Sequence, residues 1–157
     1  MKKTEFKILL VEDDVNMNPE LAEVIEFEGF IVDTAKDGKE AIKKSNDRFH
    51  NLALIDIRLP DMEGVELLTK MKNTTPKMRK IIITGYPSMQ NAINALNKGA
   101  DAYIIKPFDM GDVLKTIKEQ LKEQGEEKEY DQEKVTEFIE TRVKELEEKT
   151  VPPKKPT

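Results

Sequence analysis

A single carboxylate, Asp56, stands at the end of the apolar run 52–55. Four apolar residues in succession are typical of a strand that is buried on both faces. Pro60 follows shortly afterwards and has no N–H to donate to a sheet, so we expect the strand to end near Asp56. Open α/β sheets bind ligands at the carboxyl ends of their strands. An aspartate in this place can be a metal ligand, a nucleophile or a structural acid in a salt bridge.

Other polar side chains follow the remaining runs that we predict to be strands. They are Glu12 and Asp13 after the run 6–11, Thr84 at the end of 81–84, and Lys106 at the end of 102–106. Because parallel strands end at the same edge of a sheet, these groups can converge on Asp56. Carboxylates suit Mg²⁺, which prefers oxygen ligands. The same set suits a phosphoryl group on an aspartate, with Mg²⁺, Lys106 and Thr84 stabilising its charge.

Each of these residues also has an ordinary structural explanation. Asp13 and Asp14 can cap a helix, Asp56 can pair with a cation, and Lys106 can be a solvated strand end. These explanations give no reason for all of the polar groups to fall at strand ends, so the joint arrangement favours a site. The chain has no glycine-rich phosphate loop, and we therefore expect phosphate to come from a donor other than a bound nucleotide.

Helical patterns alternate with the apolar runs. The predicted strands are 6–11, 30–35, 52–56, 81–84 and 102–106. The predicted helices are 16–28 (or 19–28), 39–47, 65–73, 88–98, and one that is capped by Asp109 and carries Val113, Leu114, Ile117 and Leu121. In the helix 88–98 we expect Met89, Ala92, Ile93 and Leu96 to share the apolar face. Strict alternation predicts an α/β fold of three layers, a parallel sheet with helices on both faces.

The composition changes after residue 124. We predict a first domain at 1–124 and a charged extension at 125–157, with a break at 124–129, a helix at about 131–149 and a frayed Pro/Lys end. Apolar residues spaced by three and four make this helix amphipathic: Val135, Phe138, Ile139, Val143 and Leu146. About 18 helical residues cannot form a core of their own. The stripe can pack on the first domain, pair with a second copy or bind another protein.

Composition excludes several classes of function. The chain has 157 residues, of which 38% are hydrophobic and 36% charged, and a net charge of −5, which argues against direct binding of nucleic acid. No apolar run spans a membrane and no signal peptide is evident, so we expect a cytoplasmic protein. Cysteine is absent. The one histidine, His50, is expected to be solvated.

Four motifs together resemble the receiver domain of two-component response regulators, of the chemotaxis-regulator type. They are residues 11–14, Asp56 with the loop 59–64, Thr84 with Gly85, and Lys106-Pro107-Phe108. The resemblance covers about residues 5–122. It implies a flavodoxin-like, doubly wound sheet of five strands in the order 2-1-3-4-5 with five helices. The amphipathic C-terminal helix is additional, and no folded effector domain is expected after it.

The resemblance also implies a role for each site residue. Asp56 would be the phosphoacceptor, and Lys106 would bind the phosphoryl group. Mg²⁺ would be held by Glu12, Asp13, Asp56 and the backbone carbonyl of Arg58. Thr84 and Tyr103 would be the switch residues. The bond between Lys106 and Pro107 is expected to be cis.

By the same resemblance, a sensor histidine kinase would phosphorylate Asp56. The protein is not an enzyme in the usual sense, but Mg²⁺-dependent autophosphorylation from a small donor and autodephosphorylation are expected. Bulky side chains at Arg58 and Tyr86 suggest slow hydrolysis. The signal would pass through the face made by the helix 88–98, the strand 102–106 and the following helix, to a downstream protein or a second copy.

The sequence is compatible with two other functions. The chain can be a fragment of a larger transcription regulator whose effector domain is missing. A Mg²⁺-dependent phosphohydrolase also uses an aspartate after a strand, but it usually needs a second acid two residues later, where Arg58 stands.

Overall fold

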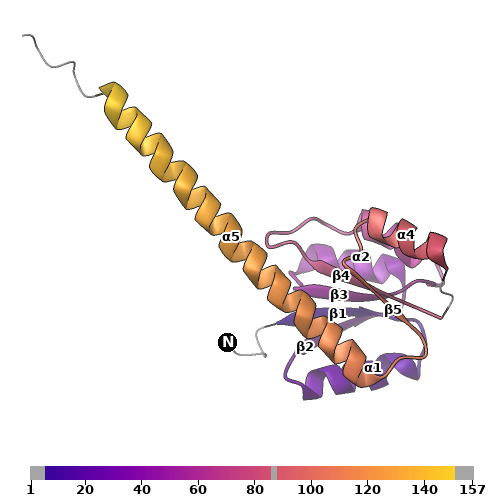
Figure 1. Cartoon of the computed structure of the whole chain (residues 1–157). Coiled ribbons are helices and arrows are strands. Elements are labelled where there is room, and N and C mark those ends of the chain that lie inside the picture. Colours follow the sequence, from indigo (N-terminus) through magenta and orange to yellow (C-terminus); the bar gives the residue numbers. More distant parts are fainter. Residues whose placement is uncertain (1–5, 86–87, 151–157) are drawn as a thin grey trace, which may run out of the picture. The chain divides into compact units, whose positions relative to one another are not determined.

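The computed structural model describes residues 6–85 and 88–150 (Figure 1). The strands are β1 (Lys7–Val11), β2 (Ile31–Ala35), β3 (Leu52–Asp56), β4 (Arg79–Thr84) and β5 (Ala102–Ile105). The helices are α1 (Met17–Phe27), α2 (Gly38–Asp47), α3 (Gly64–Lys70), α4 (Met89–Asn97) and α5 (Met110–Thr150). Within the described ranges, no helix is both long and apolar enough to cross a bilayer. The chain divides into two compact units, Met1–Gln124 and Gly125–Thr157.

The first unit is built on a five-stranded parallel sheet in the order β2-β1-β3-β4-β5. This is the order that the resemblance implies, and the prediction is confirmed. Successive side chains of a strand point to opposite faces, and two apolar clusters cover the two faces. One cluster packs the sheet against α1 and the first turns of α5, and the other packs it against α2, α3 and α4. The fold therefore has the three predicted layers.

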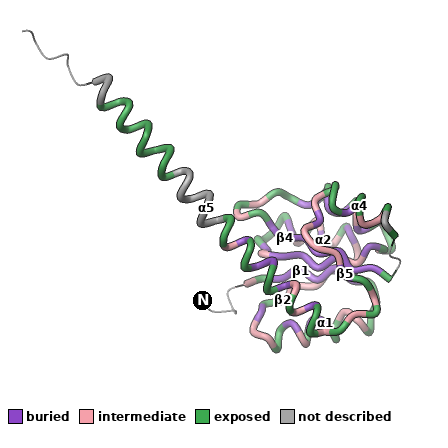
Figure 2. The backbone as a smooth tube through the Cα atoms, in the orientation of Figure 1, coloured by how far each residue is buried: buried purple, intermediate pink, exposed green. Residues whose placement is uncertain are grey.

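The strands at the centre of the sheet are almost completely buried (Figure 2). The residues Leu52 to Ile55 of β3 have no exposed surface, which confirms the prediction of a strand covered on both faces. The register aligns the strand ends: Val11 lies opposite Ile55, Asp56 opposite Ile83, and Thr84 opposite Ile105. The residues that follow β1, β3 and β5 therefore emerge at the same end of the sheet.

At the amino ends of the strands, a polar network joins the sheet to α5. The Gln124 side-chain amide donates hydrogen bonds to the carbonyl oxygens of Asn51 and Lys77, both at 2.8 Å, and accepts one from the Asn51 amide at 3.3 Å. Arg79 Nη1 lies 3.4 Å from Asp101 Oδ1 and 3.7 Å from Glu123 Oε2. Gln124 and Arg79 are both buried. This network holds α5 on the sheet as far as the end of the first unit.

The expectation of a solvated His50 is wrong. Its side chain is 1% exposed, and its Nε2 lies 3.0 Å from Asp33 Oδ2. Asp33 also pairs with Lys44 and Arg48, both at 3.3 Å. Burial lowers the pKa of His50, and the contact with Asp33 offsets this only in part. The residue precedes β3 in the sequence, but packing against β2 encloses it.

Two predictions about helices in the first unit are also wrong. The helix predicted at 65–73 ends at Lys70, and Met71 already has extended backbone angles. In α4, Ile93 and Leu96 are exposed and Ala95 is fully buried; the side chain of Met89 lies outside the described residues. Ala95 belongs to the apolar cluster on this face of the sheet, whereas Ile93 and Leu96 are exposed to solvent.

The break predicted at 124–129 is absent, because α5 runs without interruption from Met110 to Thr150. Gly125 lies inside the helix. One glycine costs only about 1 kcal/mol relative to alanine, and glutamate, lysine and glutamine around it are good helix formers. The predicted fifth helix and C-terminal helix are therefore one helix. The predicted frayed end at 151–157 lies outside the described residues.

Candidate functional site

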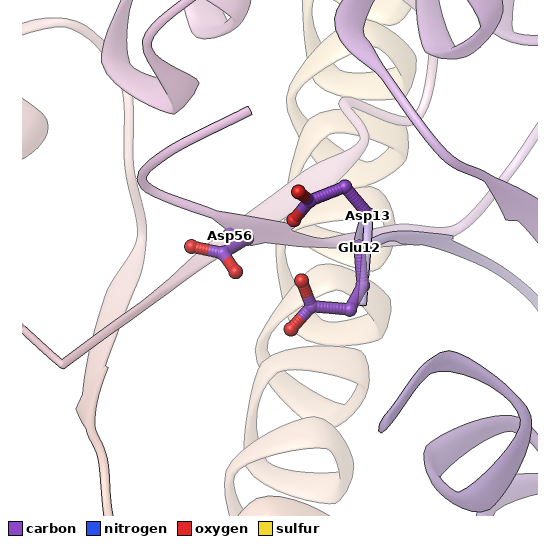
Figure 3. Close-up of side chains that lie close together, drawn as sticks. All are labelled: Glu12, Asp13 and Asp56. Carbon is purple, nitrogen blue, oxygen red and sulfur yellow. The ribbon is translucent and has the colours of Figure 1, made fainter. Parts of the chain in front are cut away.

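Three carboxylates gather at the carboxyl ends of the central strands (Figure 3). Asp56 is the last residue of β3, and Glu12 and Asp13 directly follow β1. One oxygen from each carboxylate lies within 4.8 Å of the others. Glu12 is buried, Asp56 is partly buried and Asp13 is exposed. The aligned ends of two neighbouring parallel strands therefore bring together the three acids that the sequence selects.

The Lys106 side chain reaches the same place from β5. Its Nζ lies 3.1 Å from Asp56 Oδ2 and 3.3 Å from Glu12 Oε1. Its backbone N–H donates to the carbonyl oxygen of Thr84 at 2.7 Å, so the residue still pairs with β4 just beyond the strand. The bond between Lys106 and Pro107 is cis, as predicted. Burial lowers the pKa of Lys106, but the hydrogen bonds and charges of Asp56 and Glu12 outweigh it and raise that pKa overall.

The negative charge of the three carboxylates exceeds the positive charge of Lys106. Burial raises the pKa of Glu12 to about 8, with help from the hydrogen bond and the charge of Asp56, and Lys106 lowers it only in part. Without a metal ion at neutral pH, buried Glu12 therefore either carries a proton or is destabilised by repulsion from the neighbouring carboxylates. A divalent cation can take the place of that proton.

The donor set fits Mg²⁺. This ion binds carboxylate oxygens and retains several waters, and one of the three acids, Asp13, is exposed to solvent. Glu12, Asp13 and Asp56 would hold the ion. A contribution from the Arg58 carbonyl remains a prediction. What the structure gives for Arg58 is a hydrogen bond from its N–H to Asp56 Oδ1 at 3.0 Å.

The loop after β3 is held closely around Asp56. A Cβ atom on Gly64 would lie 2.3 Å from the Asp56 carbonyl oxygen and 2.9 Å from Ile57 Cα, so only glycine fits without a backbone shift. The Gly64 N–H donates to the carbonyl oxygen of Ile57 at 2.6 Å. Each Asp56 carboxylate oxygen accepts a hydrogen bond, Oδ1 from Arg58 and Oδ2 from Lys106. The carboxylate is therefore oriented by its own loop and by β5.

Comparison with known proteins identifies this arrangement. The sequence profile of the response regulator receiver domain matches residues 8–118. The chain belongs to the response regulator receiver domain family. A CheY-like receiver domain protein from Methanospirillum hungatei is 48% identical, with a TM-score of 0.74 over 78% of this chain and 98% of that one.

Two curated relatives are longer proteins. The transcriptional regulatory protein ZraR of Klebsiella oxytoca is 34% identical over 121 residues, which are 77% of this chain and 27% of ZraR. The response regulator ArlR of Staphylococcus saprophyticus is 36% identical over 120 residues, 75% of this chain and 53% of ArlR. The chain thus spans about a quarter to a half of the length of these relatives.

The two predicted switch residues of the receiver lie on adjacent strands. Thr84 ends β4 and is completely buried. Tyr103 lies opposite Ile82 and Thr84 opposite Ile105, so Thr84 and Tyr103 point to the same face of the sheet. The Tyr103 hydroxyl is buried and has no hydrogen-bond partner among the described residues. Tyr86, predicted to influence hydrolysis, lies outside the described residues.

Sequence reasoning missed one residue that supports the receiver site, and it left the role of another open. Asp61 Oδ1 and Oδ2 accept hydrogen bonds from the N–H groups of Gly38 and Lys39, at 2.8 and 2.9 Å. It thereby ties the loop after β3 to the start of α2, and spacing along the chain offers no signal of this. Asp14 Oδ1 accepts from the N–H groups of Asn16 and Met17, which lowers the pKa of Asp14. Asn16 holds the N-cap position of α1 without a side-chain hydrogen bond, and Asp14 accepts the N–H of the first helical residue, Met17.

Proposed function

We propose that this receiver is a phosphorylatable signalling switch in which Asp56 accepts a phosphoryl group from the phosphohistidine of a sensor histidine kinase. A carboxylate oxygen of Asp56 forms the bond to phosphorus, and the bond from phosphorus to the histidine nitrogen breaks. The released imidazole carries the electron pair of that bond. The observation that carries the proposal is the contact of 3.1 Å between Asp56 and Lys106 beside two further acids.

The surrounding groups have distinct roles in this proposal. Lys106 stabilises the negative charge on the transferred group, and the Arg58 N–H orients the Asp56 carboxylate. Glu12 and Asp13 would hold Mg²⁺ together with Asp56. When bound, this ion supplies positive charge to the phosphoryl oxygens. Later hydrolysis of the acyl phosphate by water would return Asp56 to its free form.

The proposed output begins at Thr84. Its hydroxyl would donate a hydrogen bond to the phosphoryl group, and Tyr103 on the same face of the sheet would repack. The Tyr103 hydroxyl has no hydrogen-bond partner among the described residues, which supports this, because a hydroxyl that makes no hydrogen bond there loses little when it moves. The signal would then reach a partner through the face formed by α4, β5 and the first turns of α5, where Ile93, Leu96 and Ile105 are exposed.

The proposal is tested with acetyl phosphate as a small phosphodonor. Wild-type protein with Mg²⁺ should gain the mass of one phosphoryl group, and Asp56→Asn should not. Asp47→Asn, which changes an exposed aspartate at the end of α2, is the matched control and should be labelled normally. Absence of labelling in the wild type, or labelling of Asp56→Asn at the wild-type level, would contradict the proposal.

Thr84→Ala separates phosphorylation from its output. This variant should still gain one phosphoryl group, because Thr84 is not the acceptor. Hydrogen exchange in α4 and β5 should respond to phosphorylation less than in the wild type. An unchanged response in these elements would remove Thr84 from the proposed switch.

A second candidate is that the receiver forms part of a larger transcription regulator. The match to ZraR covers only 27% of that protein, and ZraR is named as a transcriptional regulator. The mass of the protein isolated from its natural source decides between the two: 18.0 kDa corresponds to this chain alone, and a larger mass to an attached domain.

A further inference from the structure

The loop between β3 and α3 folds into a small turn of its own beside Asp56. Arg58 and Glu63 form an antiparallel bridge, and between them the Leu59 N–H donates to the carbonyl oxygen of Met62 at 3.2 Å. Because the two sides of the turn are joined in this way, a displacement of its tip is passed on to its base. A constraint at the tip therefore reaches the backbone that adjoins Asp56.

Asp61 fastens the tip of this turn to α2. Its Oδ1 accepts a hydrogen bond from the Gly38 N–H at 2.8 Å, and its Oδ2 accepts one from the Lys39 N–H at 2.9 Å. These donors belong to the first two residues of α2, and the first N–H groups of a helix have no carbonyl partner inside it. The positive end of the helix dipole also favours a carboxylate there. Met62 adds to the contact, because its side chain lies where a Cβ atom on Gly38 would stand.

The base of the turn carries groups of the proposed Mg²⁺ site. The Arg58 N–H donates to Asp56 Oδ1 at 3.0 Å, so the position of the Arg58 backbone helps to set the direction of the Asp56 carboxylate. The Arg58 carbonyl is itself a predicted ligand. Mg²⁺ requires nearly ideal octahedral geometry and binds less tightly when a ligand is displaced. Both oxygens of Asp61 accept hydrogen bonds from α2, so Asp61 would act on the ion through the backbone of its turn.

We propose that Asp61 is a positioning residue of the Mg²⁺ site. By holding the turn on α2, it keeps the Arg58 backbone and the Asp56 carboxylate in the geometry that the ion requires. The inference rests on the proposed Mg²⁺ site but not on phosphoryl transfer. Coupling between two equilibria is reciprocal, so Mg²⁺ binding in turn strengthens the hydrogen bonds between Asp61 and α2.

Calorimetric titration of the full-length, unphosphorylated protein with Mg²⁺ tests this role. Asp61→Ala should weaken Mg²⁺ binding by about tenfold, the lower end of the effects of residues that support metal ligands. Asp61→Asn keeps one acceptor oxygen but loses the charge, so its affinity should lie between those of the wild type and Asp61→Ala.

Asp37→Ala is the matched control. Asp37 caps the same end of α2, where its side chain accepts a hydrogen bond from the Glu40 N–H at 2.8 Å. Removing this cap should lower the melting temperature, but the affinity for Mg²⁺ should stay at the wild-type level. A residue that only stabilises the start of α2 would behave in the same way, and this separates the positioning role of Asp61 from a structural one.

Amide hydrogen exchange provides the reciprocal measurement. Mg²⁺ should slow exchange at the Gly38 and Lys39 N–H groups of the wild type, and Asp61→Ala should lose this effect. The Glu40 N–H, which Asp37 holds, should respond less. Wild-type affinity in Asp61→Ala, or an equal loss of affinity in Asp37→Ala, overturns the role of Asp61 and leaves the metal site standing. A wild-type protein that binds no Mg²⁺ contradicts the proposed metal site itself, and the role of Asp61 with it.

Discussion

The two ends of the central sheet hold buried polar side chains in different electrostatic states. At the amino ends, the Gln124 amide pairs with the backbone of Asn51 and Lys77, and Arg79 lies near two acids. At the carboxyl ends, three acids share one lysine, and burial raises the pKa of Glu12 to about 8. In the first network a neutral amide pairs with carbonyl oxygens and the Arg79 charge faces acids of opposite sign. In the second, the negative charges outnumber the positive charge of Lys106, and groups with strongly shifted pKa values are typical of a functional site.

The largest effect should come from Glu12. Its folded pKa of about 8 lies above the ordinary value of 4.5, so the folded state holds a proton that the unfolded state loses. The unfolding free energy of the metal-free protein should therefore rise by roughly 3 kcal/mol as the pH falls from about 8 to about 5. Urea denaturation across this pH range with a chelator present measures it.

Glu12→Gln provides the control for this dependence, because the amide does not titrate. The variant should be more stable than the wild type at pH 8, and its stability should change less with pH. Mg²⁺ should flatten the wild-type profile by replacing the proton. If the free energy of unfolding of the wild type rises with pH between 5 and 8, folding does not raise the pKa of Glu12 and the prediction is wrong.

At the opposite end of the sheet, Gln124→Ala should destabilise the protein by roughly 1–2 kcal/mol, because it removes the buried amide that donates to the Asn51 and Lys77 carbonyl oxygens, and among the described residues only the Asn51 carbonyl keeps a further donor, the Arg79 N–H. Labelling of Asp56 by acetyl phosphate should remain unchanged. Lys122→Ala, at an exposed position of the same helix, should alter neither property. Loss of labelling in Gln124→Ala at a temperature where it is folded would show that the two ends are coupled.

His50 should have a smaller effect of opposite sign. Its folded pKa is lowered from 6.5, so the unfolded chain takes up a proton first and stability falls as the pH falls through 6.5. Asp33, Lys44, Arg48 and Lys7 are the charged groups around it. In a Glu12→Gln background, His50→Gln should reduce this loss of stability. If the slope is the same with and without His50, the histidine does not contribute.

The smallest effect should come from Tyr103→Phe. The hydroxyl is buried and lacks a partner in the described part of the chain, so its removal should leave stability unchanged or raise it by up to about 1 kcal/mol. Thermal denaturation of the unphosphorylated protein measures this difference. A loss of more than about 1 kcal/mol would reveal a hydrogen bond to this hydroxyl.

Some properties of the protein follow from local sequence alone. The apolar run before Asp56 predicts a buried strand, and the alternation of strands and helices predicts a parallel sheet with its strand ends at one edge. The position of Glu12, Asp13, Asp56 and Lys106 at one site then follows from topology. These inferences succeed because strand burial and right-handed crossovers depend on patterns that lie within one or two elements.

Other properties depend on contacts between residues far apart in the chain. His50 is buried by packing on β2, and Asp61 reaches the start of α2 across more than 20 residues of sequence. Arg79 and Lys80 begin β4 as buried residues because Asp101 and the backbone of α3 accept their hydrogen bonds. The unbroken α5 reflects a balance in which one glycine is outweighed by its helical neighbours. Local sequence thus determined where the chemical groups stand along the chain, and tertiary packing decided which of them are buried, paired or left with excess charge.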